Sequence, residues 1–359
     1  MKKKFLFITT TYSNNLAQLG KGNYHLMVLN LALELGYDVT LAVLDYDKKK
    51  TNDKLKLPKQ IKVYYYTNFL DYLKLLIEGN FSVIFSNART FRTLAIFPFG
   101  KKNVFMSHNY PLPKKWYQRM FFLFCIKRFN FIRTSNPAEK EILVKAGIKE
   151  NKIIDIPLCV DFSEKESSSA QFNKYKLDPN KTLLFFCNIR LFKDPETVLK
   201  AFKIVLEKKP RTKLIFAGKD MLKEEGSLTF KEMAEKLGVQ NNIIQLGYVG
   251  HDDIRSLFRL SKTFVVSSKG EGQCLVAYEA AKSGLNLCLS NIPSFNPVFN
   301  DCCLFHDVGD YKKLATNIVA YFDNPGLRKK HLNNLKKTIP KFEYDVVKRR
   351  LREELFSKF

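Results

Sequence analysis

Two glutamates within a short segment carry the strongest chemical signal in the chain. Ser268 to Ala280 reads Ser-Lys-Gly-Glu-Gly-Gln-Cys-Leu-Val-Ala-Tyr-Glu-Ala, with carboxylates at Glu271 and Glu279. The segment follows the apolar run Thr263 to Ser267, which predicts a strand, and it leads into a helical pattern. Carboxylates accept hydrogen bonds from sugar or ribose hydroxyls, and a helix N-terminus offers backbone N–H groups to phosphate. Spacing alone, however, fits helix capping and surface charge better than a binding site.

A basic pair follows another predicted strand. Arg190 and Lys193 come shortly after the apolar run Thr182 to Cys187. Cationic side chains at such a point can neutralise a phosphate leaving group as it gains charge. Taken by themselves, the two residues fit a surface role better.

Three further patterns are weaker. Asp45 and Asp47 form an Asp-x-Asp pair that could hold a divalent cation, but three lysines follow directly and we interpret the segment as a charged loop, not a metal site. His108 directly follows the predicted strand Val104 to Ser107, where an ordinary polar loop residue is the simpler interpretation. Gly20 and Gly22 lie in a loop before a helical pattern, and a flexible turn explains them equally well.

The elements that must position these residues alternate between strand and helix patterns. Predicted strands in the first half are Phe5 to Thr10, Val39 to Leu44, Ile61 to Tyr66, Val83 to Ser86, Val104 to Ser107 and Ile132 to Thr134. A second series holds Thr182 to Cys187, Lys213 to Ala217, Ile243 to Gln245, Thr263 to Ser267 and Asn286 to Ser290. Such alternation predicts two open α/β domains with parallel sheets, whose ligands bind at the carboxyl ends of the strands and face a cleft between the domains.

The expected domain boundaries follow from this series. We predict an N-terminal Rossmann-like domain over residues 1–160, a polar linker over 161–181 and a C-terminal Rossmann-like domain over 182–340. The basic amphipathic end, 341–359, is expected to cross back to the first domain. The 359-residue length suits two such domains.

Several of these segments together resemble the retaining family 4 glycosyltransferases of the GT-B fold. Glu271 to Glu279, followed by Ala280 and Gly284, resembles the family's Glu-x7-Glu signature. Further similar segments, in the same order as in the family, are Ser135, Asp155 to Pro157, Val160-Asp161, Cys187 to Lys193, Leu246 to Tyr248 and Ile254 to Leu260. The resemblance therefore extends over most of the chain.

The resemblance implies a role for each matching residue. Glu271 and His108 would be the catalytic residues, with Glu271 contacting the donor sugar. Arg190, Lys193, Gly20 and Gly22 would bind the donor diphosphate. Glu279, Gln273, Cys274 and Leu275 would hold the donor ribose and sugar, and Gly247, Tyr248 and Val249 would lie near the nucleobase.

Two cysteines depart from the family pattern. Cys274 and Cys187 stand where the family has glycine. A non-glycine residue at position 274 must either avoid a strongly positive φ or bear strain. Both substitutions bear on how tightly the donor binds, although neither removes a charge.

The implied activity is a hexosyltransferase of class EC 2.4 that retains the anomeric configuration. It would move a sugar from a nucleotide diphosphate donor, expected to be a UDP-sugar, to a hydroxyl of a glycan or lipid-linked acceptor in surface polysaccharide or glycoconjugate assembly. No cofactor or metal is expected. The alternatives are a GT-B epimerase or phosphorylase, and a non-catalytic basic protein that binds nucleic acid or membranes. Glu271 and Glu279 argue against nucleic acid as the partner.

Composition bears on location and partners. The seven cysteines contain no Cys-x-x-Cys pair, which favours a reduced compartment, and we expect a cytoplasmic protein with no secretory leader or spanning segment. The net charge of +25 favours anionic partners, and residues 1–160 hold 26 Lys/Arg against 11 Asp/Glu. The basic aromatic run Lys114 to Arg133 fits either a core helix with a basic face or a helix at an anionic membrane surface, which would make the protein peripheral at the inner face.

Overall fold

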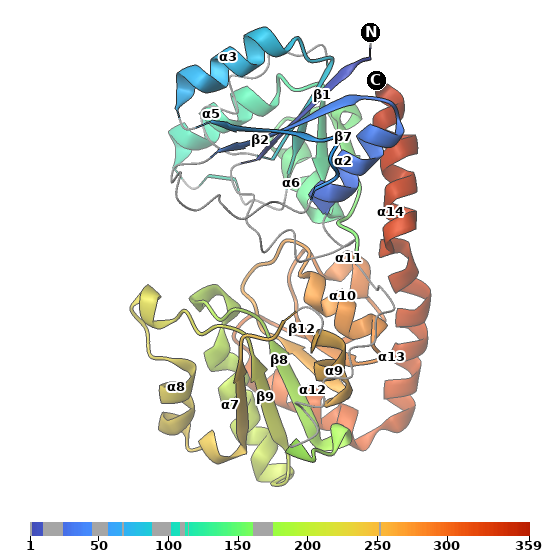
Figure 1. Cartoon of the computed structure of the whole chain (residues 1–359). Helices are drawn as coiled ribbons and strands as arrows, with labels where there is room; N and C mark the ends of the chain where they lie inside the picture. The colour runs from blue at the N-terminus through green and yellow to red at the C-terminus, as the bar shows by residue number, and fades with distance from the viewer. Residues whose placement is uncertain are drawn as a thin grey trace. The chain divides into compact units, whose positions relative to one another are not determined.

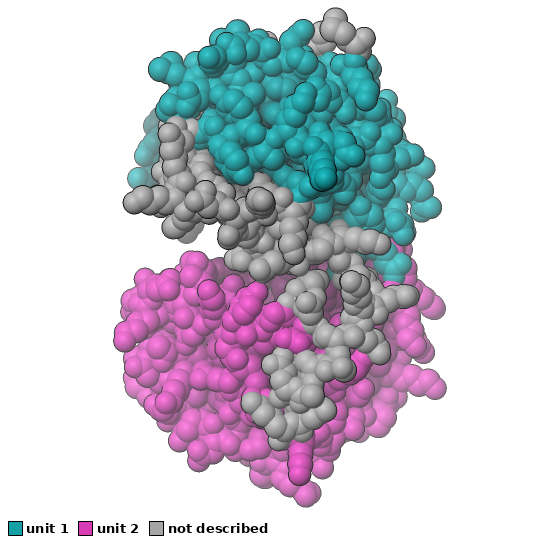
Figure 2. All heavy atoms as spheres, viewed as in Figure 1, with its two compact units in different colours: residues 1–161, 342–359 teal, residues 162–341 magenta. Residues whose placement is uncertain are grey.

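The chain divides into two compact units, shown in Figures 1 and 2. One contains residues 1–161 together with 342–359, and the other contains 162–341. The computed structural model describes residues 2–9, 24–44, 57–66, 68–87, 102–107, 112–113, 115–160, 175–250 and 253–359. Most of the predicted linker, from 161 to 174, lies outside these ranges.

The first unit is built on a seven-stranded parallel sheet with strand order β3-β2-β1-β4-β5-β6-β7. Its strands are β1 (Lys4–Thr9), β2 (Asp38–Leu44), β3 (Lys62–Tyr66), β4 (Val83–Ser86), β5 (Lys102–Met106), β6 (Phe131–Thr134) and β7 (Ile153–Asp155). The described helices between them are α2 (Tyr24–Glu34), α3 (Phe69–Gly79), α5 (Trp116–Ile126) and α6 (Pro137–Lys145). This order is that of the doubly wound Rossmann fold, with its reversal between β1 and β4.

The C-terminal segment packs on this first unit. Helix α14 (Tyr344–Arg350) continues through single turns at Leu351–Leu355 and Phe356–Lys358. The Phe356 ring lies 5.8 Å from that of Phe5 and 5.3 Å from that of Phe85, centroid to centroid. Arg350 Nη2 donates to the Asp155 carbonyl at 2.7 Å. Apolar burial and polar contacts thus hold the chain end against the sheet that contains β1 and β4.

The second unit repeats the design with six parallel strands in the order β10-β9-β8-β11-β12-β13. The strands are β8 (Thr182–Phe186), β9 (Lys213–Ala217), β10 (Ile243–Gly247), β11 (Thr263–Val266), β12 (Asn286–Ser290) and β13 (Leu304–His306). The helices are α7 (Pro195–Lys208), α8 (Phe230–Leu237), α9 (Ile254–Arg259), α10 (Leu275–Lys282), α11 (Asn296–Phe299), α12 (Tyr311–Asp323) and α13 (Pro325–Thr338). The predicted α/β architecture with two parallel sheets is therefore confirmed.

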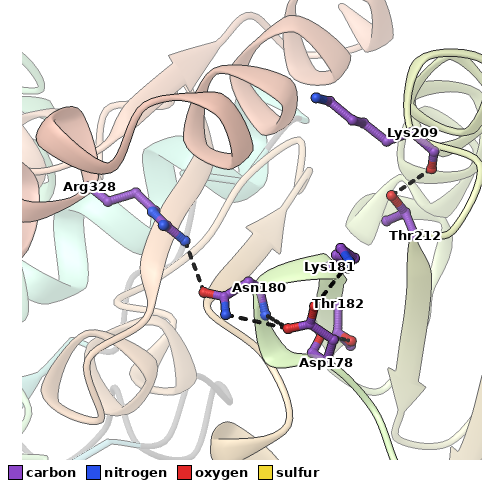
Figure 3. A network of polar contacts seen from close by, with 7 residues as sticks. All are labelled: Asp178, Asn180, Lys181, Thr182, Lys209, Thr212 and Arg328. Atoms are coloured by element: carbon purple, nitrogen blue, oxygen red, sulfur yellow. Dashed lines mark hydrogen bonds and ion pairs between the residues drawn. The ribbon is translucent and has the colours of Figure 1, made fainter.

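A polar network fixes the amino end of β8 in this unit (Figure 3). Arg328 of α13 donates to Asn180 Oδ1 at 3.2 Å, and the Asn180 backbone donates to Asp178 Oδ1 at 3.0 Å. Thr182, the first residue of β8, donates its hydroxyl to the Asp178 carbonyl at 2.8 Å. These contacts lie at the amino end of β8, so they stabilise the sheet at the edge opposite to the carboxyl ends of its strands.

A buried histidine at the edge of the second sheet makes stability depend on pH. His306 is 2% exposed, and burial, opposed by Asp310 and Asp307, lowers its pKa from 6.5 to about 4. Below its unfolded pKa the histidine binds a proton in the unfolded chain but not in the folded one, so stability is lost as the pH falls from 6.5 to about 4. When the pH is lowered from about 7.5 to about 5, this histidine should cost the wild type about 2 kcal/mol of its unfolding free energy. The variant His306→Gln should not show this loss. Urea unfolding at both pH values checks this, and equal losses would contradict it.

Candidate functional site

The carboxyl ends of β8 and β11 meet at the point where the strand order of the second sheet reverses. The two strands are neighbours in the sheet. In open α/β sheets this is the position where ligands bind, because the loops leaving the two strands diverge to opposite faces. The loop after β8 carries Arg190 and Lys193, and the loop after β11 carries Glu271.

Lys193 and Glu271 form an ion pair across these two loops. Lys193 Nζ donates to Glu271 Oε1, and the two side chains are 15% and 8% exposed. Burial alone would lower the pKa of Lys193, but the negative charge of Glu271 and its hydrogen bond to the ammonium outweigh burial and raise that pKa. The lysine is therefore a firmly charged ammonium at the strand ends.

Hydrogen bonds to backbone carbonyls hold the two loops together around this pair. Ser267 Oγ donates to the carbonyls of Lys193 and Asp194, at 2.7 and 2.9 Å. The Lys269 amide donates to the Phe192 carbonyl at 2.7 Å. With both loops tied at several points, the ammonium and the carboxylate are preorganised.

Further hydroxyls orient Glu271. Ser268 Oγ donates to Glu271 Oε1 at 2.5 Å. The Ser268 carbonyl in turn accepts a hydrogen bond from Ser290 Oγ, at the end of β12, at 2.7 Å. Ser268 and Ser290, which the sequence analysis did not single out, therefore support the carboxylate. Each is a small hydroxyl residue at the end of a buried strand or two residues beyond it, and this position is the signal that the sequence offers.

The start of α10 follows Glu271 closely. Cys274, the residue before the helix, has φ 52° and ψ 62°, in the left-handed region that favours glycine. Of the two alternatives expected for position 274, the structure shows the strained backbone with a positive φ. Gln273 is buried, Leu275 begins the helix, and Glu279 lies half-buried in its second turn. Burial, with the Glu271 charge next, raises the pKa of the Cys274 thiol well above its usual value, so the thiol is neutral.

The strain at Cys274 gives a matched prediction. Cys274→Gly and Cys274→Ala both remove the thiol, and only glycine also removes the Cβ that the left-handed conformation disfavours. We expect the glycine variant to be the more stable of the two by about 1 kcal/mol, net of the entropy that glycine adds to the unfolded chain. Urea unfolding of the two variants measures the difference. A more stable alanine variant would contradict the strained backbone.

Arg190, in the same loop, contacts Glu225 in the segment that follows β9. Its Nη1 lies 3.2 Å from Glu225 Oε1, and Glu225 Oε2 accepts from the Leu191 amide at 2.7 Å. The arginine side chain is 44% exposed. Glu225, which the sequence analysis missed, therefore anchors the loop that carries both basic residues.

The predicted nucleobase residues lie at the end of β10. The Gly218 amide, after β9, donates to the Gly247 carbonyl at 2.6 Å. Gly218 has φ +123°, and a Cβ there would collide with the Cys187 carbonyl oxygen, so only glycine fits. Tyr248 is 64% exposed and Val249 is buried. Cys187, in contrast to Cys274, does not adopt a positive φ.

The first unit holds a buried polar cluster that the sequence analysis did not identify. The Arg133 guanidinium is fully buried, lies 4.3 Å from the Tyr24 ring centroid and donates to the Ser107 carbonyl at 3.3 Å. His25 contacts Asn87 at 2.8 Å through Nε2. Burial, and then the Arg133 charge, lower the pKa of His25 to about 4, so its ring is neutral near pH 7. The one sequence feature that could have indicated this cluster is an arginine inside the short apolar strand β6.

Several predicted residues lie outside the described ranges. These are His108, Gly20, Gly22, Asp45, Asp47 and Lys114. Within the part of the chain that the structure describes, no group of three His, Cys, Asp or Glu side chains could hold a metal ion. Among the same residues, no helix is long and apolar enough to cross a membrane.

The second unit is similar in sequence to proteins named for sugar transfer or synthesis. Residues 167–339 match the family described as "Glycosyl transferases group 1". Mannosylfructose-phosphate synthase of Agrobacterium fabrum is 24% identical over 164 residues, 43% of this chain and 36% of the relative. GDP-mannose:cellobiosyl-diphosphopolyprenol alpha-mannosyltransferase of Xanthomonas oryzae pv. oryzae is 31% identical over 117 residues, 33% of this chain and 30% of the relative. The matched part of the chain thus spans about a third of each relative's own length.

Structural comparison extends over the whole chain. HepE of Anabaena in complex with UDP superposes with a TM-score of 0.81 at 15% identity, covering 99% of this chain and 100% of that one. Sucrose-phosphate synthase of Thermosynechococcus elongatus gives a TM-score of 0.75 at 15% identity, with full coverage of both chains. The fold of the chain is the GT-B fold, with two Rossmann-like domains.

Proposed function

We propose that this chain, whose residues 167–339 match the glycosyl transferases group 1 family, is a glycosyltransferase that uses a nucleotide-sugar donor. We further propose that it belongs to the retaining family 4 and carries out hexosyl transfer of class EC 2.4. The observation that carries the proposal is the Lys193–Glu271 pair at the carboxyl ends of β8 and β11. A cation and a carboxylate held side by side suit a ligand that joins a diphosphate to a sugar.

The order of the strands supports a donor lying across the edge of the sheet. From β10 to β11 the order is β10-β9-β8-β11, which is three strand spacings, or about 14 Å. A nucleoside diphosphate is of this length. With its diphosphate at Lys193, its base would reach Tyr248 at the end of β10, and its ribose hydroxyls would meet Glu279.

In the proposed reaction the bond between the anomeric carbon and the diphosphate breaks, and a hydroxyl oxygen of the acceptor bonds to the same face of that carbon. The hydroxyl proton passes to the departing phosphate oxygen. Lys193, assisted by Arg190 and the first amides of α10, stabilises the charge that develops on the phosphate. Glu271 orients the sugar and stabilises positive charge on its ring, without forming a covalent bond.

We propose a UDP-sugar as donor and a glycan or lipid-linked hydroxyl as acceptor, in the assembly of surface polysaccharide or glycoconjugates. HepE, a protein with this fold, binds UDP, and the Xanthomonas relative is named for a diphosphopolyprenol acceptor. The seven free cysteines suit the expected cytoplasmic location. His108, Gly20 and Gly22 keep their proposed roles at the acceptor and phosphate sides.

A nucleotide screen tests the donor, with a metal arm. Melting temperature is recorded with UDP-, GDP- and ADP-sugars, each with and without EDTA. A ligand at about 100 times its Kd stabilises by about 2.7 kcal/mol, so one base should give a clear upward shift. The shift should survive EDTA, since Lys193 supplies the cationic charge. No shift with any donor would contradict the proposal. A shift that EDTA abolishes and manganese or magnesium restores would indicate a metal ion at Asp45 and Asp47.

Product analysis separates the rival reactions. With the stabilising donor and a mixture of hydroxyl acceptors, a transferase releases the nucleoside diphosphate and forms a glycoside with the donor's anomeric configuration. An epimerase yields a changed sugar without an acceptor, and a phosphorylase requires inorganic phosphate.

A further inference from the structure

Helix α5 exposes apolar side chains that a monomeric soluble domain would be expected to bury. Trp116, Met120 and Phe124 are 76%, 63% and 58% exposed. Spaced four residues apart, they form one stripe along the helix. Tyr117 and Phe121 are exposed beside them. From Trp116 to Phe124 the helix therefore carries a continuous apolar face of about two and a half turns, or some 13 Å, that the described part of the chain leaves in contact with solvent.

The opposite side of the same helix is the part that packs into the domain. Phe122, Cys125 and Ile126 are buried. The Phe122 ring lies 5.9 Å from that of Phe105 in β5, and Phe105 lies 5.6 Å from Phe129. Of the two interpretations of this segment, the core helix accounts for these residues but not for the exposed stripe. The stripe needs a separate explanation.

The charges around the stripe indicate what covers it. The helix contains no acidic residue, Lys115 precedes it, Arg119 lies in its first turn, and Arg128 follows its end. All three cations are exposed, and the Arg128 guanidinium lies 4.8 Å from the Phe124 ring centroid. Cations at both ends of an aromatic stripe match a layer of phosphates over hydrocarbon, because the rings enter the interface while the charges stay at the headgroups.

We infer that α5 docks the protein on an anionic phospholipid bilayer, with the axis of the helix parallel to the surface and the stripe of Trp116, Met120 and Phe124 inserted. Lys115, Arg119 and Arg128 bind the lipid phosphates. The docking involves no residue of the donor site, so membrane binding can be tested independently of the proposed activity. A lipid-linked acceptor would then be met at the surface where it resides.

The single tryptophan of the chain, Trp116, makes the docking directly observable. Vesicles of phosphatidylcholine, with and without phosphatidylglycerol, are titrated into the full-length protein at about 50 mM salt, where the Debye length is about 13 Å. We expect binding to the anionic vesicles only, reversed at about 0.5 M salt, with a blue shift of tryptophan emission and its quenching by brominated lipid. Binding without quenching would place the contact on another surface, and absence of binding would overturn the inference.

Matched variants separate the stripe from the overall charge. Lys115→Glu with Arg119→Glu should weaken partitioning at least about tenfold. Lys329→Glu with Lys330→Glu changes the net charge equally, at two exposed lysines of α13, and should weaken it by less than about twofold. Met120→Ser should reduce binding severalfold, whereas Leu228→Ser, at an exposed leucine of the other unit, should not. Melting temperature and UDP affinity should be unchanged in every variant. Equal losses in the α13 control would show that only the total charge matters and would overturn the assignment to α5.

Discussion

Replacing Lys193 by methionine should weaken UDP binding by about 30- to 1000-fold, which corresponds to about 2–4 kcal/mol. Two effects act in the same direction. The substitution removes a charged donor from the diphosphate, and it leaves the Glu271 carboxylate, 8% exposed, without its cation beside an anionic ligand. Methionine keeps most of the side-chain volume, so packing around β8 changes little.

Calorimetric titration with UDP measures this loss. Lys200→Met is the matched control, since Lys200 forms an exposed pair with Glu196 on α7, at 2.7 Å and outside the proposed site. Exposed pairs of this kind contribute little, so its UDP affinity should stay within about twofold of the wild type. Wild-type affinity in Lys193→Met would remove the lysine from the diphosphate site.

Replacing Glu271 by glutamine should have the opposite effect on binding and a large effect on turnover. The amide keeps the shape of the carboxylate but removes a negative charge next to the diphosphate, which leaves Lys193 fully available to the phosphates. UDP affinity should therefore be unchanged or higher. Turnover should fall by about 100- to 1000-fold, because the charge that stabilises the sugar ring in the transition state is lost.

Initial rates at saturating donor, together with UDP titration, distinguish this role from a purely structural one. A structural role would lower UDP affinity and melting temperature together with the rate. Glu196→Gln, which removes the exposed partner of Lys200, is the control and should leave both quantities within about twofold of the wild type. A glutamine variant at position 271 with normal turnover would exclude the carboxylate from the reaction.

The sequence predicted the fold because its strands are short, buried and apolar. Thr263 to Ser267 and Asn286 to Ser290 were expected as strands, and they form β11 (Thr263–Val266) and β12 (Asn286–Ser290). A parallel sheet is buried on both faces, so each of its strands shows as an apolar run. Their order in the sheet could not be obtained from such runs, since pairing depends on contacts between distant segments.

The site was predictable only where residue type and spacing were distinctive. Glu271 and Lys193 were both proposed from sequence, but their direct contact joins positions 78 residues apart and becomes visible only when β8 and β11 lie side by side. Glu225 and Ser290 were missed because an acidic residue in a charged turn and a serine at a strand end are common. Arg133 was read as part of a basic run, although it lies fully buried in β6.

A crystal structure with UDP bound would test the central claim most directly, since that claim assigns the donor to the carboxyl ends of β8 and β11. We predict diphosphate oxygens within hydrogen-bonding distance of Lys193 Nζ, roughly 3 Å, with the first amides of α10 facing the same group. The ribose should lie at Glu279 and the base near Tyr248. UDP bound at any other part of the second unit, or a diphosphate that does not contact Lys193, would contradict the account.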